Sequence, residues 1–236
     1  MKRLAIIGAS HAGVSCADKL RQYGFKGTII LIDRLPGLPV QRPPLSKKLF
    51  QSNYANFEAF YLRSKEFFKR EDIELRTKSN VTSIDQKTKT IALENGDNII
   101  YDILILAMGA DAKLPDFVFE QAGNIHVLRD TQDALKLKKT AIKSDKAVII
   151  GGGFIGLEVA SSMRIAGLEV DIIESELRLL PRVASPQISE FFRLLHNKKG
   201  VSIHFGEVVT EIIYSENGRA SSVKLNSGKT LDCDVL

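Results

Sequence analysis

The sequence predicts an α/β fold that contains two copies of one plan, a parallel strand–helix–strand unit that carries a small antiparallel β excursion. Two observations predict this fold. A glycine-rich turn between an apolar run and a helical segment occurs twice, at residues 8–13 and 151–156. Short β-rich segments with turn signals follow each unit, at residues 81–104 and 209–236. We therefore expect two parallel sheets, each with its own antiparallel excursion.

The first copy begins with an apolar run at residues 4–7, and its glycine turn leads into a helix that we expect to reach Tyr23. Gly24 ends this helix, because glycine readily adopts the left-handed conformation common after a helix. The further elements expected in this copy are a strand at residues 28–32 that closes on Asp33, a hairpin at Asn95-Gly96 and a buried strand at residues 103–107.

The second copy repeats this order from the apolar run at residues 147–150. We expect a helix to about Ala166, capped by Gly167 and followed by a strand at residues 169–173 that closes on Glu174. Its β excursion begins at residue 209, and a strand equivalent to residues 103–107 begins at Val235. A buried strand needs about five residues, so we expect the chain to be truncated at its C-terminus.

Composition excludes several classes of protein. Of 236 residues, 44% are hydrophobic and 26% charged, which is typical of a globular protein and not of a disordered one. The two cysteines, Cys16 and Cys233, fit a cytoplasmic protein and exclude a disulfide-stapled fold. No apolar run approaches the roughly 20 residues that span a membrane, and no cluster has metal-ligand spacing. The net charge of +5 is spread out, so it favours an acidic protein partner and not nucleic acid.

The second glycine turn predicts an NAD site. Gly151, Gly153 and Gly156 fit G-x-G-x-x-G between a strand and a helix, where glycines allow a tight turn and close approach of a pyrophosphate. Glu174 ends the next strand, where a carboxylate binds the adenosine ribose and repels a 2′-phosphate. This favours NADH over NADPH. The alternative is a glycine-rich turn that binds no ligand.

The first glycine turn predicts a second nucleotide site with a weaker motif. Gly8 and Gly13 keep the outer glycines, but Ser10 replaces the middle one and narrows the approach to a pyrophosphate. Asp33 lies at a strand end, as Glu174 does in the second copy. Two such units in one chain indicate two nucleotides, one of them a flavin; for this unit alone, a purely structural turn is the alternative.

Several segments together resemble the FAD-dependent reductases of ferredoxins and rubredoxins. They are IIGASHAG, QRPPLSK, LRDTQDA, VIIGGGFIGLEVA and RLLPRVASPQISEFFRLLHNKKGVSI. The resemblance implies a glutathione-reductase-like fold with two Rossmann-like units. An FAD-binding domain at residues 1–112 would lack its return segment, an NAD-binding domain would follow at residues 113–236, and the C-terminal interface domain of the family would be absent.

The resemblance also implies roles for individual residues. FAD would be contacted at its pyrophosphate by Gly8, Ser10, Ala12 and Gly13, near its ribose by Asp33 or Arg34, at its adenine by Val81, beside its ring by Arg42 and Lys47, and elsewhere by Ala107, Gly109 and, from a linker strand, Arg129. NAD would be contacted by Gly151, Gly153, Phe154, Ile155, Gly156, Glu158, Glu174 and Arg182. Met108 departs from the family, which has threonine there, so a polar contact is in doubt.

The implied chemistry is hydride transfer from NADH to FAD, in which the cofactors carry the reaction. Lys47 and Glu158 are the predicted catalytic pair, joining the two domains beside the nicotinamide. The alternative for this pair is a solvated lysine and a glutamate stabilised by the helix dipole. Relatives that reduce disulfides carry a pair of cysteines on the helix near the flavin, but residues 40–50 of this chain contain no cysteine. The comparison therefore excludes disulfide reduction. Electrons would then leave the flavin for an external iron–sulfur protein.

Two functional hypotheses follow. The first is an NADH-dependent flavoprotein reductase that serves a small acidic ferredoxin or rubredoxin. The second is a truncated, non-catalytic protein that binds NAD(H) or FAD, with self-association through uncovered apolar surfaces. Two further predictions concern the helices. His196 is expected to carry partial charge at a helix end. The side chains expected to face the core are Leu135, Leu137, Phe191, Phe192, Leu194 and Leu195.

Overall fold

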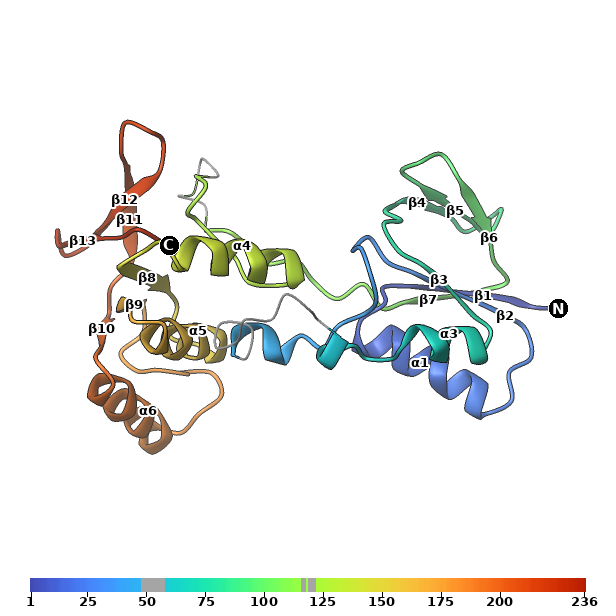
Figure 1. Ribbon diagram of the computed structural model, residues 1–236, viewed down its shortest axis with the longest axis horizontal. Coiled ribbons are helices and arrows are strands. Elements are labelled where there is room, and N and C mark those ends of the chain that lie inside the picture. Colours follow the sequence, from blue (N-terminus) through green and yellow to red (C-terminus); the bar gives the residue numbers. More distant parts are fainter. Residues whose placement is uncertain (48–57, 116–117, 119–121) are drawn as a thin grey trace. The chain divides into compact units, whose positions relative to one another are not determined.

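The computed structural model describes residues 1–47, 58–115, 118 and 122–236. By its contacts the chain divides into two compact units (Figure 1). Unit 1 comprises Met1–Gln41 and Ala55–Asp111, and unit 2 comprises Arg42–Tyr54 and Ala112–Leu236. The described residues 42–47 therefore group with unit 2, although they lie within the first domain expected from the sequence. The sequence also predicts a helix that begins after Ser46 with Lys47; residues 48–57, where it would continue, lie outside the described residues.

Unit 1 is a four-stranded parallel sheet in the order β3-β2-β1-β7. Helices lie on one face and a small antiparallel sheet on the other (Figure 1). The sheet strands are β1 (Arg3–Ile7), β2 (Thr28–Ile32), β3 (Ile73–Arg76) and β7 (Ile103–Leu106). The helices are α1 (His11–Gln22) and α3 (Lys65–Arg70), with the 3-10 turn η2 (Glu58–Phe60); the antiparallel strands are β4 (Val81–Asp85), β5 (Thr90–Leu93) and β6 (Asn98–Ile100).

Alternation along the buried strands builds the core of unit 1. Leu4 and Ile6 of β1 pack in the cluster beneath the helices, while Ala5 and Ile7 pack in the cluster beneath the antiparallel strands. Successive side chains of a strand point to opposite faces, so a strand covered on both faces reads as one continuous apolar run. This explains why residues 4–7 contain no polar position.

Unit 2 repeats this plan with a parallel sheet in the order β10-β9-β8 and an antiparallel sheet in the order β11-β12-β13. Its strands are β8 (Lys146–Ile150), β9 (Glu169–Glu174), β10 (Val201–Phe205), β11 (Val209–Tyr214), β12 (Ala220–Leu225) and β13 (Thr230–Asp232). Its helical elements are η1 (Pro43–Ser46), α4 (Thr131–Ala141), α5 (Phe154–Ile165) and α6 (Pro186–Lys198). Val235 pairs in parallel with Ala147, so it takes the place beside β8 that β7 takes beside β1. The predicted α/β fold with two similar units is confirmed.

The expected core faces of α4 and α6 are confirmed in part. Leu137 is buried, and Phe192 packs against the same core cluster. The other four side chains do not face the core: the exposed fractions of Leu135, Phe191, Leu194 and Leu195 are 36%, 57%, 54% and 39%. The buried face of α6 carries Ser189, whose hydroxyl donates to the Leu179 carbonyl at 2.6 Å, and His196. Burial lowers the pKa of His196, which disfavours the partly charged imidazole expected at the helix end.

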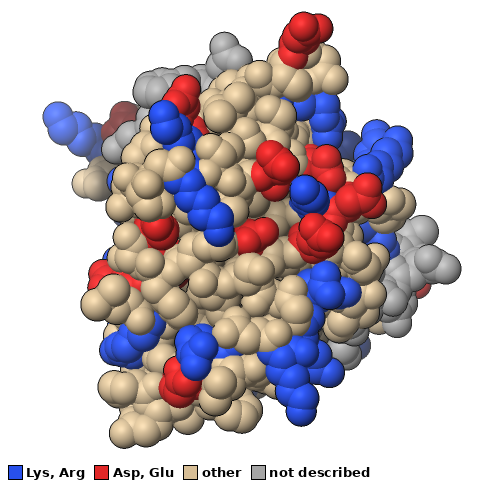
Figure 2. All heavy atoms as spheres, turned by 90° about the vertical axis from the view of Figure 1, so that its left-hand side faces the viewer, with Lys and Arg blue, Asp and Glu red and all other residues tan. Residues whose placement is uncertain are grey.

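The surface of unit 2 carries both signs of charge. On the face of the molecule drawn in Figure 2, Lys and Arg side chains are interspersed with Asp and Glu side chains. Among the described residues, no helix is long and apolar enough to cross a membrane.

Asn124 supplies the polar connection that holds residues 122–126 to the antiparallel sheet. Its fully buried amide donates to the carbonyls of Ala220 at 2.7 Å and Asp234 at 2.9 Å, and accepts from the Ala220 N–H at 3.0 Å. We predict that Asn124→Leu lowers the free energy of unfolding by about 2–4 kcal/mol, because three backbone groups lose a hydrogen bond, two of these bonds being buried. Urea denaturation measures this; the exposed control Asn98→Ala should change the free energy of unfolding by less than about 0.5 kcal/mol.

Candidate nucleotide sites

The second glycine turn (residues 151–156) uses its three motif glycines in three different ways. Gly151 has a φ of +107°, which side chains rarely tolerate. A Cβ on Gly156 would lie 2.1 Å from the Gly151 carbonyl oxygen, so the helix can approach the turn only with glycine there. Gly153 has an ordinary φ of −80°, and a Cβ on it would meet nothing within 4 Å. The protein's own packing therefore does not require glycine at 153, and the open space beside it fits a ligand.

The helices that follow the two glycine turns begin without a side-chain cap. Backbone N–H groups in the first turns of α3, α4 and α6 donate hydrogen bonds to the side chains of Ser64, Asp130 and Ser185. Gly153 and Ser10 occupy the same capping position in α5 and α1, and neither makes a side-chain cap bond. The N-terminal amides and the positive dipole end of both helices are thus left for an anion, as phosphate-binding helices require.

Glu174 anchors the second glycine turn. Its carboxylate is only 7% exposed and accepts from the backbone N–H of Gly152 at 2.8 Å and of Glu176 at 2.9 Å. A Cβ on Gly152 would come within 2.9 Å of this carboxylate. The structure therefore gives Glu174 a role in shaping the turn that spacing alone did not reveal; its contact with a ribose remains a prediction.

Unit 1 contains the same arrangement at the first glycine turn (residues 8–13). The Asp33 carboxylate accepts from the Ala9 N–H at 2.7 Å and from the Leu35 N–H at 2.8 Å. A Cβ on Gly13 would lie 1.9 Å from the Gly8 carbonyl oxygen, which matches the packing of Gly156 on Gly151. The sequence signal that could have revealed this bond is the acid that ends the second strand of both copies.

Among the other predicted residues of unit 1, Ala107 lies against this turn. Ala107 donates its N–H to the Ile7 carbonyl at 2.8 Å, and a Cβ on Gly8 would lie 2.3 Å from the Ala107 carbonyl oxygen. Arg34 forms an ion pair with Asp111. Gly109 follows with a φ of +70°, and Val81 packs with the cluster beneath the antiparallel strands. Ala12 lies in the first turn of α1.

Lys47 and Glu158 are brought together, as the sequence predicted. Lys47 Nζ lies 2.9 Å from Glu158 Oε1. Both residues group with unit 2 by their contacts. That the pair joins an FAD-binding and an NAD-binding domain stays a prediction. Helix α5 carries Glu158 near its start, and η1 carries the chain to Lys47.

Ser46 is a site residue that sequence reasoning missed. It is only 5% exposed, and its hydroxyl donates to the other oxygen of Glu158 at 2.5 Å. Its carbonyl accepts from the Ser162 hydroxyl at 2.7 Å, which fixes η1 against α5. Glu158 is therefore held through both of its oxygens, by a cation on one side and a hydroxyl on the other.

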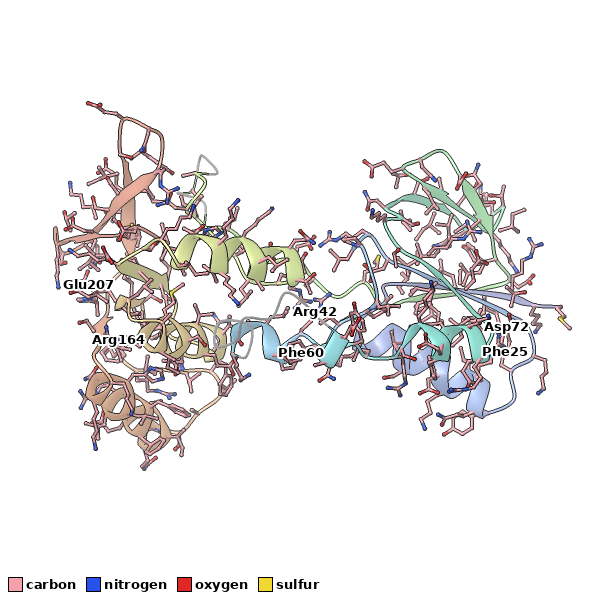
Figure 3. The ribbon with its side chains drawn as sticks, viewed as in Figure 1. Phe25, Arg42, Phe60, Asp72, Arg164 and Glu207 are labelled. Atoms are coloured by element: carbon pink, nitrogen blue, oxygen red, sulfur yellow. The ribbon has the colours of Figure 1, made fainter. Side chains whose placement is uncertain are left out.

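The three predicted arginines in unit 2 differ in their surroundings. Arg129 lies in a bend before α4, not in the strand expected for it, because Asp130 begins the helix directly afterwards. Its Nε is buried without a hydrogen-bond partner among the described residues, a state that a ligand oxygen would relieve. Arg182 is exposed before α6, and Arg42, labelled in Figure 3, directly precedes η1.

A cavity of about 710 Å³ lies beside the second glycine turn. The turn residues Gly151, Gly153 and Ile155 line it together with apolar side chains such as Leu128 and Met163. Phe154 and Ile155 line the same cavity and are 55% and 57% exposed, which leaves them available to a bound molecule.

The thiols and metal-binding side chains do not form a second kind of site. Burial and the neighbouring Asp234 raise the pKa of Cys233 to about 11, and burial raises the pKa of Cys16, so neither is a thiolate at neutral pH. Within the described ranges, no group of His, Cys, Asp and Glu could hold a metal ion.

Comparison with known proteins gives consistent matches over the whole chain. The model of the family described as pyridine nucleotide-disulphide oxidoreductase matches residues 2–236. The chain is 35% identical to rubredoxin-NAD(+) reductase of Pseudomonas putida over 99% of its own length and 60% of that protein. A ferredoxin reductase structure from Rhodopseudomonas palustris has a TM-score of 0.93 at 36% identity, covering all of this chain and 57% of that one.

A further solved structure, a covalent complex of putidaredoxin reductase with putidaredoxin, has a TM-score of 0.93 at 32% identity. The match covers 99% of this chain and 57% of that chain. The chain therefore spans less than two thirds of the length of these relatives.

The three uses of glycine at the second turn give a paired prediction. Gly153→Ala should keep the fold, since its φ is ordinary and its surroundings are open, but should weaken NADH binding at least about tenfold by crowding the pyrophosphate. Gly156→Ala should instead lower the thermal midpoint, because its methyl group meets the Gly151 carbonyl. Calorimetric NADH titration and thermal melts measure the two effects; equal behaviour of both variants would contradict this division.

Ser46 should matter through the orientation of Glu158. We predict that Ser46→Ala lets the Glu158 carboxylate leave Lys47 and slows reduction of bound flavin by NADH about three- to tenfold, the effect of one lost charge-assisted hydrogen bond. Ser46→Thr keeps the hydroxyl and should restore the rate. Stopped-flow absorbance measures the rate; failure of threonine to restore it, despite an intact fold by circular dichroism, would assign Ser46 to packing alone.

Proposed function

Because the chain belongs to the pyridine nucleotide-disulphide oxidoreductase family, we propose that it performs the NADH-to-FAD half-reaction of a ferredoxin or rubredoxin reductase. The observation that carries this proposal is the pair of uncapped glycine-turn helices, with Lys47 and Glu158 paired beside the second one. Members of the family bind FAD and NAD(P). The named relatives support an iron–sulfur protein as the acceptor.

The residues present fit both nucleotides. In unit 2, Gly153 leaves open space at the start of α5, and the backbone amides there are without a side-chain cap. In unit 1, Ser10 takes the equivalent position, and its hydroxyl is not used to cap α1. We propose FAD for unit 1, with the domain extending over residues 1–112, and NAD for unit 2, with the domain extending over residues 113–236.

The second turn would hold NAD through residues that the structure already orders. Glu174 keeps the turn open by binding the Gly152 N–H, and its carboxylate disfavours a 2′-phosphate nearby. Phe154 and Ile155 would cover the nucleotide, and Arg182 lies beyond the end of β9. These features support NADH as the preferred nucleotide.

The chemistry itself comes from the nucleotides: bound NADH supplies a hydride and bound FAD accepts it. The chain contributes charge and position. Glu158 holds the Lys47 ammonium at 2.9 Å, and Ser46 fixes the second oxygen of the same carboxylate. The Lys47 ammonium, held in one position, would stabilise negative charge on the flavin. Because the ion pair with Glu158 is already ordered, less free energy is needed to reorganise it during the reaction.

The acceptor is proposed from chemistry and comparison. The two thiols have raised pKa values and cannot relay electrons as thiolates, so direct transfer to an external acceptor is favoured. The net charge of +5 supports an acidic partner. The solved complex of putidaredoxin reductase with putidaredoxin supports a ferredoxin-type protein in this role.

The decisive experiment is anaerobic mixing of the FAD-loaded chain with NADH or NADPH while flavin absorbance is followed. NADH should bleach the flavin faster than NADPH, and Lys47→Ala should slow bleaching about tenfold or more while NADH affinity changes by less than about threefold. Lys198→Ala, which removes an exposed lysine at the end of α6, is the control and should leave the rate unchanged. NADH binding without bleaching would favour the binding-only hypothesis, and tighter NADPH binding would contradict the role given to Glu174.

A further inference from the structure

A second cavity in unit 2 lies outside both glycine turns and is lined by positive charge. Its volume is about 630 Å³, within the range of small-molecule sites. Four cationic side chains line it: Lys136, Lys139 and Lys143 from the α4 region, and Arg219 from the loop before β12. We call this cavity the anion pocket. It contains no residue of either glycine turn.

The positive charge of the anion pocket is not neutralised by the described residues around it. None of its four cations forms an ion pair with a described carboxylate. Among the described residues of its lining, the acid Asp133 is already engaged, because it accepts from the backbone N–H groups of Arg129 at 2.8 Å and Asp130 at 3.1 Å. Four cations around one concave surface repel one another and attract a multiply charged anion.

Helical spacing places the lysines together. Lys136 and Lys139 are three residues apart on one face of α4, and Lys143 follows in the turn after the helix. Thr140 lies on the same face, and its hydroxyl donates to the Lys136 carbonyl at 3.2 Å. Flexible ammonium groups in such a row suit phosphate or carboxylate groups carried on one molecule.

His126, a titratable side chain, also lines the anion pocket. Its Nε2 lies 2.8 Å from the Thr140 hydroxyl oxygen. Burial lowers the pKa of His126, with smaller contributions from Arg219 and Lys136 in the same direction, while Asp133 opposes them. The positive charge of the pocket therefore disfavours protonation of this ring.

We propose that the anion pocket binds a small organic molecule with more than one phosphate or carboxylate group. Its charged groups would contact the lysine row and Arg219. Its carbon skeleton would pack against the apolar part of the lining, which includes Ile125 and Val127. The anion pocket adjoins the cavity beside the second glycine turn, because both are lined by Leu114, Val118, Ile125, His126 and Val127. The three lysines and Arg219 line the anion pocket alone, and the proposal rests on these cations and not on the proposed reductase function.

Titration calorimetry at low ionic strength tests the proposal with inorganic tripolyphosphate and citrate as probes. We expect saturable one-to-one binding of at least one probe; tighter tripolyphosphate binding indicates a phosphorylated ligand, and tighter citrate binding a carboxylated one. Lys136→Gln/Lys139→Gln/Lys143→Gln should weaken this binding at least about tenfold. In NMR pH titrations the probe should raise the pKa of His126, because a bound anion offsets the neighbouring cations.

The matched control is Lys69→Gln/Lys87→Gln/Lys89→Gln, which removes three exposed charges from unit 1 and should change affinity less than about twofold. Equal loss in both triple variants would show diffuse charge attraction and overturn the proposal. Binding of poly-glutamate through the lysine row, without binding of either small anion, would overturn it in favour of docking by an acidic protein. NADH titration of the same variants checks that the fold and the glycine turn are intact.

Discussion

One hydrogen-bond pattern underlies both nucleotide sites: a carboxylate at the end of the second strand accepts from the second backbone N–H of the glycine turn. Asp33 binds Ala9 in unit 1, and Glu174 binds Gly152 in unit 2. Each carboxylate also accepts from an N–H two residues further along its own chain. The bond joins two adjacent parallel strands at their carboxyl ends, where ligands bind in open α/β sheets, and it fixes the turn before any ligand arrives.

The glycines of the two turns have different structural roles beside this hydrogen bond. Gly8 and Gly151 supply backbone conformations with positive φ, and Gly13 and Gly156 allow the helix to pack against the turn. These four positions are demanded by the protein itself. Gly153 is different, since neither its φ nor its surroundings require glycine. Its equivalent, Ser10, shows that unit 1 folds with a side chain at this position. Glycine at 153 is therefore explained by the ligand, not by the fold.

Unit 2 also contains an ordered ion pair, Lys47–Glu158, near the start of the helix that follows its glycine turn. The proline-rich segment before Lys47 folds as η1 and packs on α5 through the bond from Ser162 to the Ser46 carbonyl. This contact places Ser46 and Lys47 on the two oxygens of Glu158. The pair is partly exposed, so its free energy is modest. Its importance lies in orientation, because a lysine from a distant segment becomes fixed relative to the start of a nucleotide-binding helix.

The repeat, the strand and helix order, and the positions of both glycine turns could be predicted from the sequence, because these depend on local periodicity and on backbone conformations that glycine alone tolerates. Lys47 and Glu158 could also be predicted, though through family resemblance and not through spacing. Other features depend on contacts between segments far apart in the chain, which periodicity does not reveal. Ser46 is a partner of Glu158, and the lysines of the α4 region line one cavity with Arg219. The burial of Arg129 Nε could not be predicted from the sequence either. The outward face of α6 shows the same limit: Phe191 and Leu194 have helical spacing typical of a core, but periodicity identifies an apolar face without saying what covers it.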